Sequence, residues 1–116
     1  MEYIQEQAFE KRKYPRIDLE TEVIIKPTDD DSMILGWIQD ISHGGFRVRA
    51  DIPLSFKDVF HDRNAVLFKT YEDFFRLKGR GEISWISTEG NEAGIKFDEL
   101  ENKSRKFLEE FLKICL

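Results

Sequence analysis

The stretch FFRLKGRGEISWIS, residues 74–87, carries the clearest alternation of apolar and polar side chains in the sequence. Its apolar positions on one side of the alternation are Phe75, Leu77, Ile83 and Trp85. Successive side chains of a strand point to opposite faces of a sheet, so this period predicts a strand with one buried face. Gly79 and Gly81 lie on the apolar side, where missing side chains permit a sheet to coil sharply.

Other stretches rich in β-branched and aromatic residues predict further strands, which are 19–26, 33–41, 45–50, 65–71 and about 93–97. In the third of these, the residues expected on the buried face are Phe46, Val48 and Ala50, with Arg47 and Arg49 on the other face. Residues 51–64 are less regular, and a short strand is expected around Leu54–Asp58.

The end of the chain has a helical period instead. Apolar residues recur at helical spacing at Phe107, Leu108, Phe111, Leu112 and Cys115. Asn102 is expected to be the N-cap of this helix, and Cys115 is expected to be a small core residue. Strands followed by one terminal helix predict an all-β fold with a helix, namely a small antiparallel β-barrel on which the helix packs.

The length of 116 residues predicts one domain. We expect residues 1–10 to be an N-terminal arm or a short helix. Residues 11–116 are expected to form the domain, with its C-terminal helix at about 101–115. Apolar residues make up 41% of the chain and charged residues 35%, which indicates a folded rather than a disordered protein.

The formal net charge of −5 argues against a general nucleic-acid coat. The single cysteine, Cys115, excludes an intramolecular disulfide and is consistent with a reducing compartment. No apolar run approaches the length of a membrane span, and the first residues are unlike a signal peptide. A cytoplasmic protein without membrane insertion is therefore expected.

Signals of catalysis and of metal binding are weak. Asp40, Ser42 and His43 have the residue types of a catalytic triad, but neighbours on one strand end do not converge as nucleophile, base and orienting group. His43, His61 and Cys115 lack a recognised metal-ligand spacing. We expect no enzyme activity, no metal and no cofactor.

A basic segment precedes the first predicted strand and reads Lys11-Arg12-Lys13-Tyr14-Pro15-Arg16. The guanidinium groups of Arg12 and Arg16 suit an anion, because each bonds phosphate oxygens in pairs and stacks on aromatic bases. A solvated basic arm is the alternative interpretation of this segment.

A polar turn lies between the second and third predicted strands and reads Asp40-Ile41-Ser42-His43-Gly44-Gly45. Asp40 and Ser42, two apart, project to one side, where they suit the donor edge of a guanine or a phosphate. The two glycines allow positive φ and let a ligand approach the backbone. An ordinary tight turn, with Asp and Ser bonded to the local backbone, is the alternative.

Taken together, these two motifs resemble those of the PilZ domain, which has R-x-x-x-R followed about two dozen residues later by [D/N]-x-S-x-x-G. Arg12 to Arg16 fit the first motif and Asp40 to Gly45 fit the second. Gly81-Glu82-Ile83-Ser84-Trp85 and Gly94-Ile95-Lys96-Phe97 are similar to the later strands of the family. The resemblance runs from about residue 11 to residue 100.

The resemblance implies a six-stranded antiparallel barrel with a C-terminal α-helix, and cyclic di-GMP as the ligand. Arg12 and Arg16 would contact phosphate and guanine, Asp40 and Ser42 would bond a guanine edge or a phosphate, and Gly45 would keep the site open. Further candidates for ligand contacts are Lys11, Lys13, His43 and Gly44.

The arginines precede the first strand while Asp40 lies on the barrel, so we expect residues 1–16 to fold onto the barrel when the ligand binds. The surface formed would then signal to a protein partner. One rival is a PilZ-like interaction module that acts without ligand. Another is a small barrel for single-stranded nucleic acid, but the predicted aromatic residues lie opposite the basic face of Arg76, Lys78 and Arg80.

Overall fold

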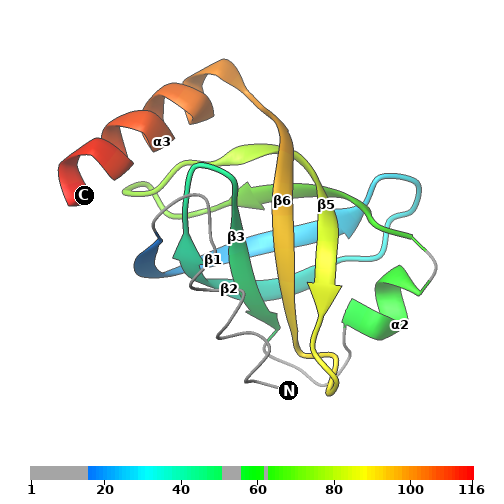
Figure 1. Ribbon diagram of the computed structural model, residues 1–116. Coiled ribbons are helices and arrows are strands. Elements are labelled where there is room, and N and C mark those ends of the chain that lie inside the picture. Colours follow the sequence, from blue (N-terminus) through cyan, green and yellow to red (C-terminus); the bar gives the residue numbers. More distant parts are fainter. Residues whose placement is uncertain (1–15, 51–55, 62) are drawn as a thin grey trace.

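A closed barrel of antiparallel strands forms the body of the protein (Figure 1). The computed structural model describes residues 16–50, 56–61 and 63–116. The strands in these ranges are β1 (Ile17–Pro27), β2 (Ile34–Ile41), β3 (Gly45–Ala50), β4 (Ala65–Thr70), β5 (Lys78–Ile86) and β6 (Glu92–Leu100). Their order around the barrel is β1-β2-β3-β6-β5-β4, so pairing of β1 with β4 closes it. The predicted six-stranded antiparallel barrel is confirmed.

In β1, β2, β3 and β4 the buried residues alternate with outward ones, as the period of two requires, and fill the barrel interior. Val23 and Ile25 of β1 are fully buried, and so is Val48 of β3. The ring of Phe46 packs edge-on against Phe68, with ring centres 5.2 Å apart. The buried face predicted for residues 45–50 is therefore confirmed, and Arg47 and Arg49 remain on the outer surface.

Strands β5 and β6 approach each other closely because β5 carries two glycines. A Cβ atom on Gly79 would lie 2.3 Å from the carbonyl oxygen of Glu99, and one on Gly81 would lie 2.3 Å from that of Lys96. The pairing register also shifts between Arg80 and Gly81, as at a β-bulge. The two glycines therefore permit the close approach of β5 and β6, and the sharper coiling expected at this point stays a prediction.

Helix α3 (Asn102–Cys115) packs on the loop between β4 and β5 (Figure 1). The ring of Phe75 contacts Phe107 and Phe111 edge-on, with centroids 5.2 Å apart in both pairs. The backbone N–H of Lys78 donates to the Ser104 hydroxyl at 2.9 Å, which ties the start of β5 to the first turn of α3. No helix in the described part of the chain is long and apolar enough to cross a membrane.

Outside the region of the candidate site, three local predictions are wrong. The region of the expected strand at Leu54–Asp58 contains helix α2 (Phe56–Phe60), which buries Phe56, Val59 and Phe60 at helical spacing. Leu54 lies outside the described residues. The N-cap of α3 is Glu101 and not Asn102, and it makes no side-chain capping bond. Cys115 is exposed, because the last buried residue of the helix is Leu112.

Candidate functional site

The turn between β2 and β3 is closed by bonds within itself. The backbone N–H of Ser42 donates to the carbonyl of Gly45 at 2.9 Å. The Ser42 hydroxyl in turn accepts the N–H of Gly44 at 3.2 Å, and the serine is buried. The local bonding considered as the alternative for Ser42 is therefore present.

Gly44 and Gly45 do not have positive φ, contrary to the expectation from the sequence; among the described residues only Gly90 does. Gly45 has a different reason to be glycine. Its Cβ would lie 2.0 Å from the carbonyl oxygen of Ile95, so only a bare backbone fits against β6. The glycine thus fixes the turn close to β6.

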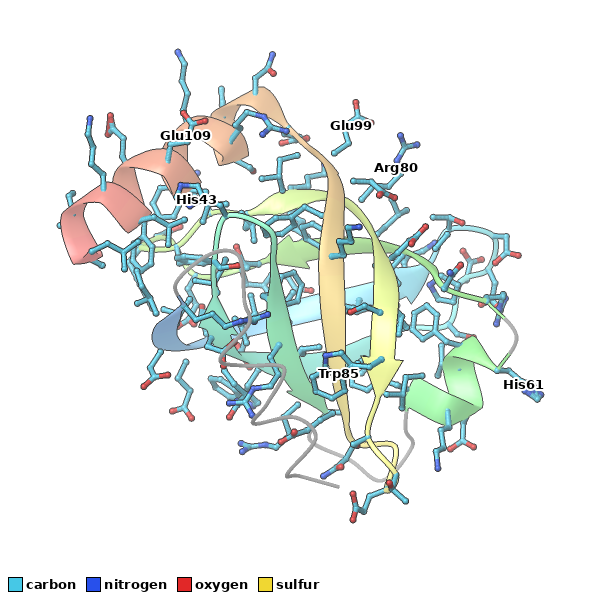
Figure 2. The ribbon with its side chains drawn as sticks, viewed as in Figure 1. His43, His61, Arg80, Trp85, Glu99 and Glu109 are labelled. Atoms are coloured by element: carbon cyan, nitrogen blue, oxygen red, sulfur yellow. The ribbon has the colours of Figure 1, made fainter. Side chains whose placement is uncertain are left out.

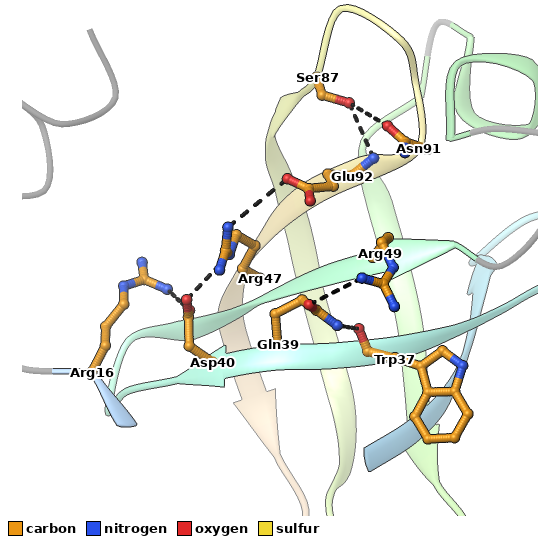
Figure 3. A network of polar contacts seen from close by, with 9 residues as sticks. All are labelled: Arg16, Trp37, Gln39, Asp40, Arg47, Arg49, Ser87, Asn91 and Glu92. Carbon is orange, nitrogen blue, oxygen red and sulfur yellow. Dashed lines mark hydrogen bonds and ion pairs between the residues drawn. The ribbon is translucent and has the colours of Figure 1, made fainter. Parts of the chain in front are cut away.

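The carboxylate of Asp40 lies between two arginines (Figure 3). One oxygen accepts from an Nη of Arg16 at 2.9 Å, and the other accepts from Nε of Arg47 at 3.1 Å. Arg47 also lies 3.9 Å from a carboxylate oxygen of Glu92. Because a buried carboxylate is stable only when paired, the two guanidinium groups explain how Asp40 can be buried here.

Arg16 has an unused donor. Its Nε atom is shielded from solvent, and no described residue accepts a hydrogen bond from it. The side chain as a whole is 24% exposed and lines a surface cavity. A shielded donor without an acceptor costs about 1–3 kcal/mol, so an acceptor at this place would be favourable.

Trp85 lies on the outer surface of the barrel, whereas the alternation of residues 74–87 predicted it on the buried face. The pairing register shifts between Ile83 and Trp85. Ile83 pairs with Ile95, which is buried, but Trp85 pairs with Gly94. On its other side Gly94 pairs with Arg47, which points outward, so Trp85 points outward too. An extra residue in one strand of an antiparallel pair reverses the alternation, and this bulge is the cause of the error.

The indole of Trp85 lies directly over Gly94. A Cβ on Gly94 would be 2.1 Å from the indole nitrogen, so the ring occupies the space that a side chain would fill. Figure 2 places Trp85 in front of the lower half of the β5–β6 pair. The indole ring of Trp85 therefore lies on the outer face of the barrel.

A cavity of about 240 Å³ joins these features. Its lining includes Arg16, Ser42, Gly45, Trp85 and Lys96. Two cations beside an aromatic ring suit a ligand that is both anionic and aromatic, because guanidinium and ammonium groups bind phosphate while the indole offers a stacking surface.

Of the residues predicted to bind ligand, the structure brings together Arg16, Asp40, Ser42, Gly44 and Gly45. Asp40 lies behind Arg16 and does not line the cavity itself. His43 lines a neighbouring hollow under α3, which Gly44 also lines. Lys11, Arg12 and Lys13 lie outside the described residues.

Sequence reasoning missed three residues of this region, which are Arg47, Trp85 and Lys96. Arg47 and Lys96 occupy outward positions next to the turn, so their place beside Asp40 and Gly45 follows once the strand pairing is known. Gly94 is the residue in the sequence that could have indicated the outward position of Trp85. A glycine at an outward strand position makes room for a large ring on the neighbouring strand.

The sequence also matches a family model. Residues 10–113 match the model described as the PilZ domain. The chain belongs to the PilZ domain family. No curated protein sequence matches it.

Solved structures share the fold at low sequence identity. The Bacillus subtilis inhibitor of motility MotI/DgrA is 19% identical, with a TM-score of 0.62 over 88% of this chain. The PilZ domain of Escherichia coli YcgR with c-di-GMP is 13% identical, with a TM-score of 0.63 over 87% of this chain and 88% of its own.

The Borreliella burgdorferi PlzA protein in complex with c-di-GMP is 16% identical, with a TM-score of 0.61 over 95% of this chain and 45% of its own. This chain spans 50% of the Bacillus protein. These similarities show the fold. PilZ domains are in general receptor modules without catalytic activity.

Proposed function

We propose that this PilZ domain is a cytoplasmic receptor for cyclic di-GMP. The observation that carries the proposal is the cavity in which Arg16, Ser42 and Trp85 meet, because it offers cationic donors and an aromatic surface together. The ligand class is taken from similar structures, since both the YcgR domain and PlzA contain c-di-GMP.

Each residue of the cavity has a distinct role in this proposal. Arg16 donates to a phosphate or guanine oxygen through its unused Nε, and Trp85 stacks on a base. Arg47 keeps Asp40 paired when Arg16 turns to the ligand, so the carboxylate is never buried alone. Gly45 lets the turn lie close against β6 at the edge of the cavity.

The binding free energy of a micromolar ligand requires several of these contacts together. A micromolar dissociation constant corresponds to about −8 kcal/mol. A charge-assisted hydrogen bond contributes about 1.5–3 kcal/mol, and stacking contributes about 1–3 kcal/mol for each base. Arg16 alone is therefore insufficient, and Arg12, four residues earlier in the sequence, is the proposed second arginine. Lys11, Lys13 and His43 are further candidates.

The hypothesis that residues 1–16 fold onto the barrel with the ligand remains a prediction. It is tested by amide exchange of residues 3–16 with and without cyclic di-GMP. Greater protection in the presence of ligand is expected. Equal protection in both states would contradict this part of the proposal and leave the ligand site itself untouched.

The direct test is calorimetry with cyclic di-GMP on the wild type, Arg16→Ala and Arg80→Ala. Loss of Arg16 should weaken binding by about ten- to a hundredfold, from one to two charge-assisted bonds. Arg80 is a matched control, since it is an exposed arginine paired with Glu99. Affinity should also fall with added salt because phosphate contacts are screened.

An unchanged affinity for Arg16→Ala would remove this residue from the site. Absence of binding by the wild type would instead favour an interaction module that acts without ligand. The internal bonding of Asp40 and Ser42 is compatible with that second candidate, because both side chains are satisfied without a ligand.

Single-stranded nucleic acid is a poorer candidate. The basic side chains proposed for it each lie next to an acidic one: Arg76 with Asp73, Lys78 with Glu101 and Arg80 with Glu99. A nucleic acid would have to compete with these ion pairs for every cation.

A further inference from the structure

A second hollow lies on the outer face of the barrel, over β1, β4, β5 and the end of β6. We call it the basic groove; its volume is about 490 Å³, and its lining includes Ile24, Lys26, Leu67, Lys69, Arg80 and Leu100. Figure 2 shows Arg80 and Glu99 at the upper end of the β5–β6 pair, away from Trp85 at the lower end. The groove is thus separate from the cavity that Arg16 and Trp85 line.

The floor of the basic groove is apolar and open. Ile24 of β1 pairs across the sheet with Leu35 of β2, and both side chains point outward. Leu67 of β4 is 37% exposed and Leu35 is 46% exposed. Leu35 and Met33, which directly precedes β2 and is 61% exposed, lie outside the lining of the groove. Neighbouring apolar side chains on an outer barrel face mark an interaction surface rather than scattered exposure.

The rim of the basic groove is positive although the chain is negative. Four cations and two anions line it, against a formal net charge of −5 for the whole chain. Lys69 lies directly opposite Lys78 in the β4–β5 pairing. Like charges at opposed positions are destabilising in a sheet, so an anionic group placed between them would relieve this repulsion.

Lys69 is also unpaired among the described residues, whereas its neighbours Lys78 and Arg80 have Glu101 and Glu99 as partners. The groove therefore presents at least one cation that no described acidic side chain neutralises, directly beside apolar Ile24. The matching occupant combines carboxylates with apolar side chains.

We propose that the basic groove binds an acidic amphipathic helix of a protein partner. Such a helix places apolar side chains on one face and carboxylates along its edges, which fits an apolar floor with a positive rim. A symmetric contact between two copies would bring the same positive rim against itself. An anionic membrane is disfavoured because its extended negative surface faces the whole chain, with its net charge of −5, whereas a short helix meets only the positive rim.

The proposal is tested by nuclear magnetic resonance on the isotope-labelled full chain. The probe is a capped synthetic peptide of about 18 residues, or five helical turns, with leucines at helical spacing and glutamates on the remaining face. The same peptide with lysine in place of glutamate is the second probe. We expect the acidic peptide to shift the amide signals of Leu67, Lys69 and Arg80, and the basic peptide to leave them unchanged.

Three variants locate the contact. Lys69→Glu should weaken binding of the acidic peptide at least about fivefold through rim electrostatics, and Leu67→Glu should weaken it further, because Leu67 lies on the apolar floor. Both side chains are exposed, so the fold should tolerate the changes. Lys106→Glu makes the same charge change on an exposed position of α3 outside the groove and should have no effect.

Several outcomes would overturn the proposal. They are no binding of the acidic peptide at millimolar concentration, equal binding of the basic peptide, and shifts confined to residues 42–45. Self-association in sedimentation that Leu67→Glu abolishes would assign the groove to a second copy. Groove-dependent binding to vesicles containing phosphatidylglycerol would assign it to a membrane. None of these results depends on whether cyclic di-GMP binds.

Discussion

At the lower end of the β5–β6 pair Gly94 makes room for the indole of Trp85, whereas at the upper end Gly79 makes room for the backbone of β6. In the first case the atom nearest to an added Cβ belongs to a side chain, and in the second it is a carbonyl oxygen. A side chain can rotate away, but a strand cannot move without disturbing its pairing. The two glycines therefore serve different purposes, one for the site and one for the fold.

The outer surface also differs between the two ends of the β5–β6 pair. Near Gly94 the outer face carries the paired Asp40, the guanidinium groups of Arg16 and Arg47, and the indole ring of Trp85. Near Gly79 it carries the apolar floor and positive rim of the basic groove. The two proposed surfaces, the nucleotide site and the basic groove, thus both use the β5–β6 pair, because the pleat offers outward positions along its whole length.

The largest effect is expected for Gly79→Ala. The new Cβ would lie 2.3 Å from the Glu99 carbonyl oxygen and 3.0 Å from the Leu100 Cα, so backbone atoms must move. Overpacking of this kind costs about 2–3 kcal/mol. Denaturant unfolding measures the loss, and calorimetry on the folded variant should give an unchanged affinity for cyclic di-GMP. A variant as stable as the wild type would show that β5 and β6 can separate cheaply.

Gly94→Ala should reduce the affinity for cyclic di-GMP more than the stability of the fold. The methyl group displaces the indole of Trp85 rather than the backbone, so the fold should lose less stability than with Gly79→Ala. Loss of one stacking surface should weaken nucleotide binding about tenfold, which is about 1.4 kcal/mol. Calorimetry and denaturant unfolding of the same samples separate the two effects. Retained affinity would exclude Trp85 from the site.

The smallest expected effect is a change of stability with pH, and it arises in the turn between β1 and β2, beside the basic groove. Its Asp30 carboxylate accepts hydrogen bonds from Ser32 and pairs with Arg63, and these contacts lower the pKa of Asp30 from 3.8 to about 2. The ionised form therefore stabilises the native state above about pH 3.8, and this contribution is lost as pH falls through about 2. Carbon-detected titration of the carboxyl group measures the midpoint.

Arg63→Ala should raise the Asp30 midpoint only part of the way toward 3.8, because the Ser32 amide is the larger cause and remains in place. Asp30 also positions Lys26 of the groove, whose ammonium donates to the Asp30 carbonyl at 2.8 Å. A wild-type midpoint near the ordinary value would mean that the turn is not held as described, and the rim of the groove would then be less fixed than the nucleotide site.

The barrel could be predicted from the sequence because its signals are local. The period of two in residues 45–50 and the helical period after residue 101 each follow from side chains close together in the chain. The two main errors have separate causes. The bulge before Trp85 moved that ring to the outer face, and Phe56 to Phe60 formed a helical turn where a short strand was expected.

The candidate site was predictable only in part. Arg16, Asp40, Ser42 and Gly45 came from two short motifs, and the structure places them together. Arg47 and Trp85 could not be found in this way, because their place beside Asp40 and Arg16 depends on the register of β3 and β5 with their neighbours. The reason for Gly45 was also beyond sequence reasoning, since it lies in the approach of β6 and not in φ.

The most direct test of the proposed nucleotide site is a titration of the isotope-labelled protein with cyclic di-GMP, followed through the amide signals and the indole N–H signals of both tryptophans. We expect shifts at Ser42–Gly45, at residues 94–96 and at the indole of Trp85, with Lys69 and Arg80 unchanged. Saturating ligand that leaves the Trp85 indole and the turn unshifted, or that shifts only the basic groove, would contradict it.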